Sequence, residues 1–332
     1  MGEVSNVDKF EACIRLKEAL RERPARVLLN DMLDSDKTKI EPVFARRKGL
    51  RYPYVEQVTG LSPVDALGLL EELSRTGVLR KVLYDKTVFC PDCASPEISI
   101  HFNCPNCGSQ DTVKLSLIED MGCGYIDKEE RFRTDGKLVC PHCGRILSRP
   151  GIDFRRVGIW YVCNSCESEF DMPIITYSCR TCGRSFSMEE ALYEAIYSYE
   201  MEESVRDVAM TIRNVLNSLT GLLRSRGFSV ESPGFVNGRS GEEHMFDLIA
   251  AQGADKSLVV DVFVADSSIP ERVVTNMFAK LYDTAFADAF LIAIPRVREE
   301  GRRLAGLYRI RLVEGSSRDE VVRGFRDLAG FS

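Results

Sequence analysis

The sequence lacks any apolar run long enough to cross a membrane. The longest runs, such as ADAFLIAIP at 287–295, fall far short of the roughly 20 residues that a spanning helix needs. The first residues, MGEVSNVDKF, are charged and lack the apolar segment of a secretory signal, and Asn6 stands where an N-myristoylation signal has serine or threonine. We therefore expect a cytoplasmic protein with no membrane partner.

The sequence also lacks an excess of positive charge. It holds 44 lysines and arginines against 50 aspartates and glutamates, a formal net charge of -6. The acidic excess lies in residues 187–332, which hold 17 basic and 23 acidic residues. Because binding by phosphate neutralisation needs a basic face, general affinity for nucleic acid is not expected. Only local basic patches could supply it.

Length and composition predict a multidomain α+β protein. With 332 residues, 44% of them hydrophobic, the chain can bury two or three cores. Local patterns divide it into a helical and winged-helix domain (1–88), a multi-zinc ribbon module (89–186), a helical connector (187–203) and an α/β domain with a mixed sheet (204–332).

The first section reads mainly as helices. Phe10, Cys13 and Leu20 recur at helical spacing, so Cys13 is expected in a core. Ser62 and Pro63 are good first residues for a second helix that ends near Gly77. The next stretch, VLRKVLYDKTVF, is predicted to form a two-stranded wing that turns at Asp85. Residues 25–88 thus resemble a winged helix-turn-helix.

Such a winged helix could read DNA or dock a protein. The start of the helix at 63–76, PVDAL, offers no side chain suited to reading bases. Basic residues cluster instead at Arg46, Arg47 and Lys48. Fold alone does not decide between the two functions, and both remain open.

Eleven of the twelve cysteines lie in residues 89–186, and ten of these form five Cys-x-x-Cys pairs. In a reducing compartment such a pair presents two thiolates to one zinc ion, whereas disulfides or redox sites are the alternatives. Three pairs are followed by glycine, which permits the left-handed backbone found after a zinc knuckle. The spacing therefore favours zinc.

Pairing neighbours along the chain predicts three zinc sites. The first ribbon takes Cys90, Cys93, Cys104 and Cys107. The second ribbon takes Cys140, Cys143, Cys163 and Cys166. The third site takes Cys123, Cys179 and Cys182, with Asp120 as the fourth ligand. A structural site is preferred over an open, catalytic one with bound water, and His101 and His142 are interpreted as ordinary histidines.

The order of these elements resembles a known family. CPDC, NCPNC, a lone D-x-x-C-G, CPHCG, YVCNSC and a last knuckle are similar to the archaeal zinc-ribbon module called the thaumarchaeal output domain. The resemblance covers residues 89–186 and implies a regulatory output module of signalling proteins rather than an enzyme. Family members carry His-x-x-Cys-Gly between their ribbons, where this sequence has Asp120.

The second predicted ribbon carries the best candidate surface for nucleic acid. Its basic residues are Arg145, Arg149, Arg155 and Arg156. Nearby aromatic residues could stack on the bases of single-stranded DNA or RNA, or could instead pack the hairpin: Phe154, Trp160 and Tyr161.

The connector is predicted to be helical. Ser187 and Glu190 fit a capping box, and no glycine or proline follows before Gly221. Its glutamates are interpreted as a solvated face, with a signalling lever as the alternative.

The last section alternates helices and strands and resembles the restriction-endonuclease-like fold. That resemblance assigns Asp247 and Asp261 to the carboxylates that hold Mg2+ in active members, but Phe263 stands where the motif has lysine. Lys280 is the candidate replacement. We favour an inactive domain, while Glu243 and His244 beside Asp247 keep the nuclease alternative open.

Together these features predict a zinc-binding regulatory protein of archaeal type that binds nucleic acid or passes on a signal. The alternatives are a metal-dependent nuclease and a protein–protein scaffold.

Overall fold

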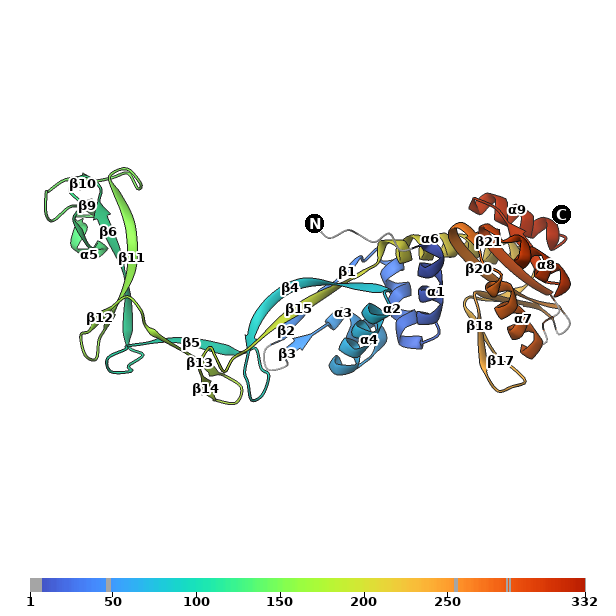
Figure 1. Cartoon of the computed structure of the whole chain (residues 1–332), viewed down its shortest axis with the longest axis horizontal. Coiled ribbons are helices and arrows are strands. Elements are labelled where there is room, and N and C mark those ends of the chain that lie inside the picture. The colour runs from blue at the N-terminus through green and yellow to red at the C-terminus, as the bar shows by residue number, and fades with distance from the viewer. Residues whose placement is uncertain (1–7, 46–48, 254–255, 285, 287, 332) are drawn as a thin grey trace. The chain divides into compact units, whose positions relative to one another are not determined.

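The computed structural model describes residues 8–45, 49–253, 256–284, 286 and 288–331. This part of the chain contains nine helices and several separate sheets, the mixed α+β class that the sequence predicts (Figure 1). Contacts divide the chain into two compact units. The first unit comprises Met1–Val43, Arg51–Tyr84 and Tyr197–Ser332, and the second comprises Phe44–Leu50 and Asp85–Ile196.

The amino-terminal part of the first unit is mainly helical. Its helices are α1 (Lys9–Ala19), α2 (Arg23–Asp34), α3 (Pro53–Thr59) and α4 (Pro63–Arg75), and its short strands are β1 (Lys39–Ile40), β2 (Val43–Ala45) and β3 (Gly49–Arg51). Asp8 caps α1 by accepting a hydrogen bond of 3.2 Å from the backbone N–H of Phe10. Ser62 caps α4 in the same way, and Gly60 ends α3 in the left-handed conformation. The predicted helix that begins at Pro63 is confirmed.

The predicted two-stranded wing is wrong, because its residues form one continuous strand, β4 (Leu79–Phe89). A tight hairpin needs residues with positive φ at its turn, and none of the described residues 83–87 has one. In the three-stranded sheet β1-β15-β4, the neighbour of β4 is a strand from more than a hundred residues later. Sequence pattern could not reveal so distant a partner.

The predicted helical connector at 187–203 is also wrong, because only its last residue, Glu203, is helical. Residues Leu192–Met201 form strand β15, and the helix begins only at α6 (Glu203–Ser225). Glu190 does accept a hydrogen bond of 2.9 Å from the N–H of Ser187, as a capping box requires, but only a turn follows. Ile196, Tyr199 and Met201 are buried in β15. Pairing with β1 and β4 therefore overrides the local helical signal.

The carboxyl-terminal part of the first unit is built on the mixed sheet that the sequence predicts. Its strand order is β16-β19-β20-β21-β22, with antiparallel pairing from β16 to β20 and parallel pairing from β20 to β22. The bounds are β16 (Ser229–Glu231), β19 (Leu248–Gln252), β20 (Lys256–Ile269), β21 (Asp288–Val297) and β22 (Arg311–Glu314). Every residue of β20 from Leu258 to Ala265 is buried, as expected for a central strand covered on both faces.

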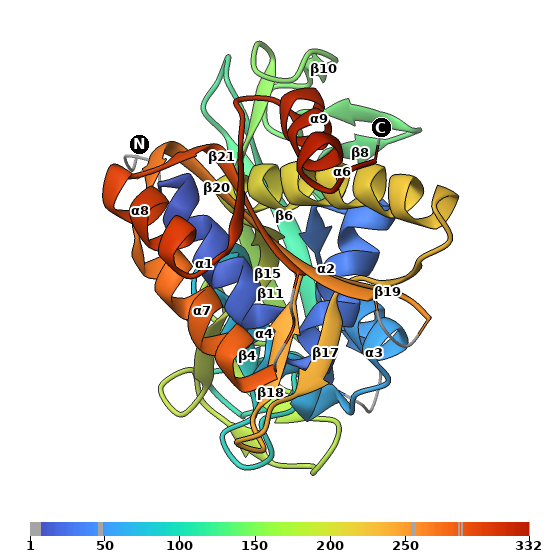
Figure 2. The same cartoon turned by 90° about the vertical axis from the view of Figure 1, so that its right-hand side faces the viewer.

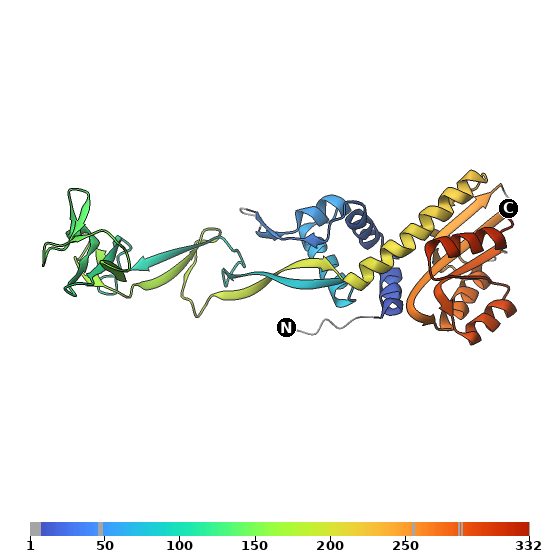
Figure 3. The same ribbon diagram turned by 90° about the horizontal axis from the view of Figure 1, so that it is seen from above.

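Helices and a hairpin complete this part of the unit. The helices are α7 (Arg272–Thr284), α8 (Glu299–Leu307) and α9 (Arg318–Leu328), and the hairpin joins β17 (Gly234–Asn237) to β18 (Glu243–Phe246). In Figure 3 the long yellow helix α6 runs beside the orange and red elements of this part, and its buried residues include Val208, Val215 and Leu219.

Helix α1 packs with the carboxyl-terminal sheet although it opens the chain. Its buried side chains Phe10, Cys13 and Leu16 belong to the same core as β20 and α6, and Figure 2 shows α1 beside α7. The sequence places α1 in a separate domain ending at residue 88. Cys13 is fully buried as predicted, and burial raises the pKa of its thiol to about 11.

The second unit is made of antiparallel ladders in which the chain runs out and back. Strand β5 (Ile98–Asn103) pairs with β13 (Ile174–Cys179), and β6 (Thr112–Asp120) pairs with β11 (Phe154–Cys163). Its shorter elements are β7 (Ile126–Lys128), α5 (Glu129–Phe132), β8 (Arg133–Thr134), β9 (Lys137–Val139), β10 (Ile146–Leu147), β12 (Glu169–Phe170) and β14 (Ser185–Phe186). This connectivity brings early and late parts of the unit together, which decides the cysteine pairing.

Candidate metal centres and a buried acid–lysine site

Three clusters of ligand atoms lie in the second unit. In each cluster the four sulfur or carboxylate atoms lie within 4.8 Å of one another, and each could hold one metal ion. The first cluster is Cys90, Cys93, Cys179 and Cys182. The second is Cys104, Cys107, Cys163 and Cys166. The third is Asp120, Cys123, Cys140 and Cys143. These are the twelve residues that the sequence singles out, but the predicted pairing is wrong.

The pairing is nested rather than sequential because of the two ladders. Thr112 of β6 lies opposite Cys163 of β11, so the turn before β6 meets the turn after β11. In the same way Ile98 of β5 lies opposite Cys179 of β13. Each outer pair of cysteines therefore meets a pair from the returning chain. Pairing by proximity along the sequence fails because the hairpins it assumes do not form.

Six short turns of one geometry supply the ligands. In each, the residue after the second ligand has positive φ: Ala94, Gly108, Gly124, Gly144, Glu167 and Gly183. The N–H of that residue donates to the carbonyl of the first ligand, at 2.8 Å for Cys104 and 2.7 Å for Asp120. Asp120-x-x-Cys123-Gly124 is therefore a sixth knuckle with a carboxylate in the first position. With six knuckles, no Cys-x-x-Cys pair is left over.

The predicted role of Asp120 beside Cys123 fits the third cluster. Its Oδ2 lies 3.4 Å from Sγ of Cys123 and 3.1 Å from Sγ of Cys143. Its Oδ1 accepts hydrogen bonds from the backbone N–H of Gly122, at 2.7 Å, and from the guanidinium of Arg145. Burial alone would raise the pKa of Asp120, but the N–H of Gly122 and the surrounding thiols lower it overall. The carboxylate is thus ionised with one oxygen directed at the thiols.

The thiols of the other clusters also receive hydrogen bonds. Contacts from Ser168 and from the side-chain amide of Asn106 lower the pKa of the Cys166 thiol to about 6. The backbone N–H groups of Thr181 and Cys182 point at Sγ of Cys179, at 3.4 and 3.5 Å. Such donors favour the thiolate, the form that binds metal. No disulfide links cysteines in the described part of the chain.

The four candidate arginines of the second predicted ribbon are each paired with an acid. Arg145 pairs with Asp120, Arg149 with Asp153, Arg155 with Glu119 and Arg156 with Glu129. Their partners were not part of the predicted patch, and they cancel its formal charge. Arg46, Arg47 and Lys48 of the other predicted patch lie outside the described residues.

Two of the three candidate stacking residues pack internally. Phe154 is only 5% exposed and belongs to a small core with Ile118 and Phe132. The ring of Tyr161 stacks between those of Phe102 and Phe170, at centroid distances of 5.9 and 5.8 Å. These two side chains pack the ladders, while Trp160 is half-buried.

In the first unit, Asp247 and Asp261 lie together as the sequence predicts. Oδ1 of Asp261 accepts a hydrogen bond of 3.1 Å from the N–H of Asp247, and Oδ2 of Asp247 accepts one of 2.7 Å from the N–H of Val262. Their side chains are 6% and 3% exposed, so the two negative charges are removed from water.

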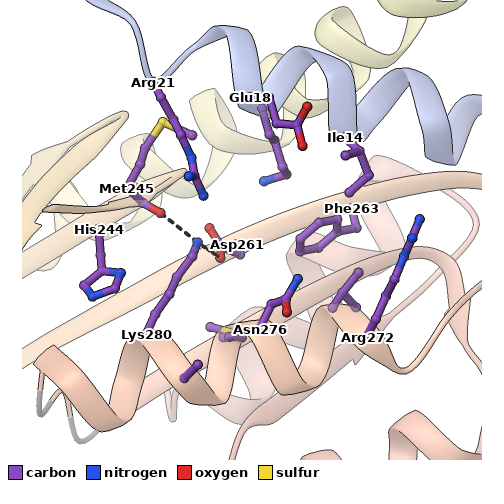
Figure 4. A pocket seen from close by; sticks show the side chains of 14 residues that line it. Ile14, Glu18, Arg21, His244, Met245, Asp261, Phe263, Arg272, Asn276 and Lys280 are labelled. Atoms are coloured by element: carbon purple, nitrogen blue, oxygen red, sulfur yellow. Dashed lines mark hydrogen bonds and ion pairs between the residues drawn. The ribbon is translucent and has the colours of Figure 1, made fainter. Parts of the chain in front are cut away.

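Two lysines neutralise this acid pair. Lys280 of α7 donates to Oδ2 of Asp261 at 2.8 Å and to the carbonyl of Met245 at 2.7 Å (Figure 4). Lys17 of α1 donates to Oδ2 of Asp247, and its Nζ lies 4.4 Å from the ring centroid of Phe263, the residue at the motif lysine position. We call Lys17, Asp247, Asp261 and Lys280 the acid–lysine quartet.

The charges of the quartet shift one another's protonation. Burial raises the pKa of Asp247. Burial acts in the same direction on Asp261, but Lys280 and Lys17 outweigh it and lower the pKa of that carboxyl. Burial would lower the pKa of Lys17, yet Asp247 and Asp261 raise it. Two buried carboxylates and two ammonium groups thus form a balanced set.

The sequence-based prediction missed Lys17, although a signal for it exists. Lys17 follows Phe10, Cys13 and Ile14 at helical spacing, so it interrupts the apolar stripe of α1 where a core residue is expected. The other neighbours of Asp247 behave differently. His244 pairs with Asp283 at 2.7 Å instead, and Glu243 is exposed. Hydrogen bonds from Ser240 and His244 lower the pKa of Asp283 to about 2.

The second unit is a candidate metal-binding module, because its ladders bring pairs of knuckles together into three ligand clusters. The same chain also forms the α/β part of the first unit. Sequence comparison identifies the family: the profile of thaumarchaeal output domain 1 matches residues 16–201, more than half of the chain. The chain belongs to this family. The matched segment extends beyond residues 89–186, where the resemblance is visible by eye, and includes β1, α2–α4 and β15.

Other comparisons add little. No curated protein matches the sequence. The crystal structure of AF1548, a protein of unknown function, matches with a TM-score of 0.29 and 16% identity over 36% of this chain and 67% of that chain. EndoMS in apo form matches with a TM-score of 0.20 and 10% identity over 66% of this chain and 97% of that one. Among the described residues, no helix is long and apolar enough to span a membrane.

Proposed function

We propose that the protein is a zinc-binding regulatory factor that serves as a signalling output component of archaeal type. The observation that carries this proposal is the presence of three four-ligand clusters in the family segment. The small cores of the second unit hold few apolar residues, for example Cys90, Cys179 and Phe186 in one of them. Structural zinc supplies folding free energy that such cores lack.

The donor chemistry and spacing fit zinc. Tetrahedral zinc with Zn–S bonds of about 2.3 Å holds its thiolates about 3.8 Å apart. The Sγ atoms of Cys90 and Cys182 lie 3.6 Å apart, and those of Cys107 and Cys163 lie 3.5 Å apart. Two clusters offer four thiolates, and the third offers three thiolates and one carboxylate oxygen. All four positions in each cluster come from the protein, which is typical of a structural site.

Native protein is therefore expected to carry three zinc ions per chain. Native mass spectrometry or elemental analysis of the purified full chain measures this directly. Two or fewer zinc ions after purification in the presence of excess zinc would contradict the proposal for at least one cluster.

Arg145 is expected to hold Asp120 in its ligand orientation. Groups that hydrogen-bond a metal ligand typically contribute 10- to 100-fold in affinity. Arg145→Ala should therefore weaken the third cluster for zinc by about that factor and leave the two four-cysteine clusters unchanged. Competition with a zinc chelator, followed by native mass spectrometry, measures the loss of the third ion.

A matched control for this variant is Arg131→Ala. Arg131 is 67% exposed, lies in the same unit and pairs with Asp127 rather than with Asp120. Its replacement should leave all three zinc affinities unchanged. Equal weakening in both variants would show a general effect of lost charge rather than a role for the Arg145–Asp120 contact.

The nuclease alternative is disfavoured by the acid–lysine quartet. Oxygen atoms of both carboxylates accept hydrogen bonds from ammonium and backbone N–H groups, and Phe263 replaces the motif lysine. We expect no cleavage of single- or double-stranded DNA or RNA by the purified protein with Mg2+ or Mn2+. Cleavage that disappears in Asp261→Ala would overturn this conclusion.

Nucleic-acid binding without cleavage stays a prediction. The side chains of Arg155 and Arg156 are 60% and 61% exposed within their ion pairs. Exposed ion pairs are weak, so these arginines could exchange their carboxylate partners for phosphate groups. A zinc ion with four thiolates adds a formal charge of about -2, which opposes binding. If these arginines bind phosphate, Arg155→Ala/Arg156→Ala should weaken oligonucleotide binding and flatten its dependence on salt concentration, because two phosphate contacts are lost. Measuring oligonucleotide affinity at several salt concentrations tests this prediction.

A further inference from the structure

A pocket of about 380 Å³ lies between α1 and α7, and three members of the acid–lysine quartet, Lys17, Asp261 and Lys280, form part of its wall. Figure 4 shows Arg21 entering from the turn after α1, and Asn276 and Lys280 entering from α7. Apolar side chains of Ile14, Phe263 and Met277 form part of the lining. The volume is at the lower end of the range of small-molecule sites, about 300–1,000 Å³.

The pocket is positively charged because of two arginines outside the quartet. The quartet itself is balanced, so the excess comes from Arg21 and Arg272 against the single acid Glu18. Neither guanidinium has a carboxylate partner among the residues that the structure describes. Within the described residues, the guanidinium of Arg272 interacts only with the ring of Phe10, and its Cζ lies 4.9 Å from the ring centroid. This stacking contact leaves the N–H donors of Arg272 free. This contrasts with the four paired arginines of the second unit.

We propose that this pocket binds a small phosphate ester that also carries a flat apolar group, of the size of a nucleoside monophosphate. Arginine presents planar N–H donors that suit phosphate oxygens. The apolar lining accommodates the ring, and Asn276 supplies a neutral donor and acceptor. The site recognises its ligand and performs no chemistry on it. This proposal concerns the first unit, so it does not depend on zinc in the second.

The test is equilibrium binding to the full chain with four probes: adenosine monophosphate, adenosine, inorganic phosphate and a short single-stranded oligonucleotide. The monophosphate is expected to bind, with affinity at least about tenfold above that of adenosine, because charge-assisted hydrogen bonds to phosphate contribute that much or more. Inorganic phosphate should compete weakly, since it lacks the ring.

Two variants locate the binding. Arg21→Ala/Arg272→Ala should weaken the binding of the monophosphate by about tenfold or more. Because both side chains are exposed, this variant should fold normally. Arg303→Ala is the matched control, because Arg303 is 79% exposed on α8 and does not line the pocket; it should bind as the native chain does. Far-ultraviolet circular dichroism verifies folding of each variant.

Three results would overturn the proposal. The first is the absence of measurable binding of the monophosphate and of phosphate at millimolar concentrations. The second is unchanged affinity in Arg21→Ala/Arg272→Ala. The third is an oligonucleotide that binds far more tightly than the monophosphate and loses its affinity in that variant, which would make a nucleic-acid strand the source of the phosphate.

Discussion

The double variant Cys93→Ser/Cys182→Ser is expected to bind two zinc ions per chain, the same number as either single variant. Both cysteines belong to the first cluster, with Cys90 and Cys179, so the second substitution removes a ligand from a site that is already disrupted. Sequential pairing places Cys93 and Cys182 in different sites and predicts only one remaining ion. Native mass spectrometry distinguishes the two counts directly.

Cys93→Ser/Cys107→Ser provides the reciprocal control. Nested pairing places these residues in the first and second clusters, so this double variant should retain one zinc ion. Sequential pairing places both in one ribbon and predicts two. Nested pairing predicts more bound zinc in Cys93→Ser/Cys182→Ser than in Cys93→Ser/Cys107→Ser, and sequential pairing predicts the reverse. General instability of serine variants would lower both zinc counts and cannot produce either difference. Two ions in Cys93→Ser/Cys107→Ser, with one in Cys93→Ser/Cys182→Ser, would show the nested pairing to be wrong.

The chemistry of these clusters could be read from sequence, but their connectivity could not. Cys-x-x-Cys spacing is a local property, and the left-handed residue after each knuckle is local too. Which knuckles meet depends on ladders such as Asp120 opposite Phe154, which no local pattern encodes. One local sign was available: Asp120-x-x-Cys123-Gly124 repeats the spacing of the three glycine-terminated pairs. Six equivalent knuckles can be divided into three complete sites by nested pairing as well as by sequential pairing.

The same distinction explains the other errors. Residues 192–201 have no glycine or proline and read as helix, yet distant partners make them strand β15. Asp247 and Asp261 were identified because the sequence around them resembles the metal-binding motif of the restriction-endonuclease-like fold. Lys17 stands out less, since lysine is common on helices, and its carboxylate partner lies 230 residues away. Sequence reasoning thus names buried charges more reliably than it names their counter-ions.

Lys17→Met is expected to lower the free energy of unfolding of the first unit by about 3–5 kcal/mol, because removing one partner of a buried ion pair leaves the other charge uncompensated. The Lys17 side chain is 13% exposed and that of Asp247 is 6% exposed, so water replaces the lost ammonium poorly. Urea unfolding followed by circular dichroism at 222 nm measures the effect, since eight of the nine helices in the described chain, all except α5, lie in the first unit.

Lys9→Met is the matched control on the same helix. Lys9 pairs with Asp266 of β20 at 3.5 Å, but the two side chains are 43% and 55% exposed. Exposed ion pairs contribute only about 0–1 kcal/mol, so this variant should unfold nearly as the native protein does. Trp160, the only tryptophan, lies in the second unit. Its fluorescence should therefore report an unfolding transition that is unchanged in both variants.

The pH dependence identifies the charge responsible. Burial already raises the pKa of Asp247, and loss of the Lys17 ammonium should raise it further. A raised carboxyl pKa in the folded state destabilises the protein fully above that pKa and has no effect below the unfolded value of about 3.9, where both states are protonated. The difference between Lys17→Met and the native chain should therefore shrink as pH falls toward 4. Adding Asp247→Asn should restore much of the stability at pH 7. A deficit that is independent of pH and is not relieved by Asp247→Asn would mean that Lys17 stabilises the unit through packing on Phe263 and not through the buried charge pair.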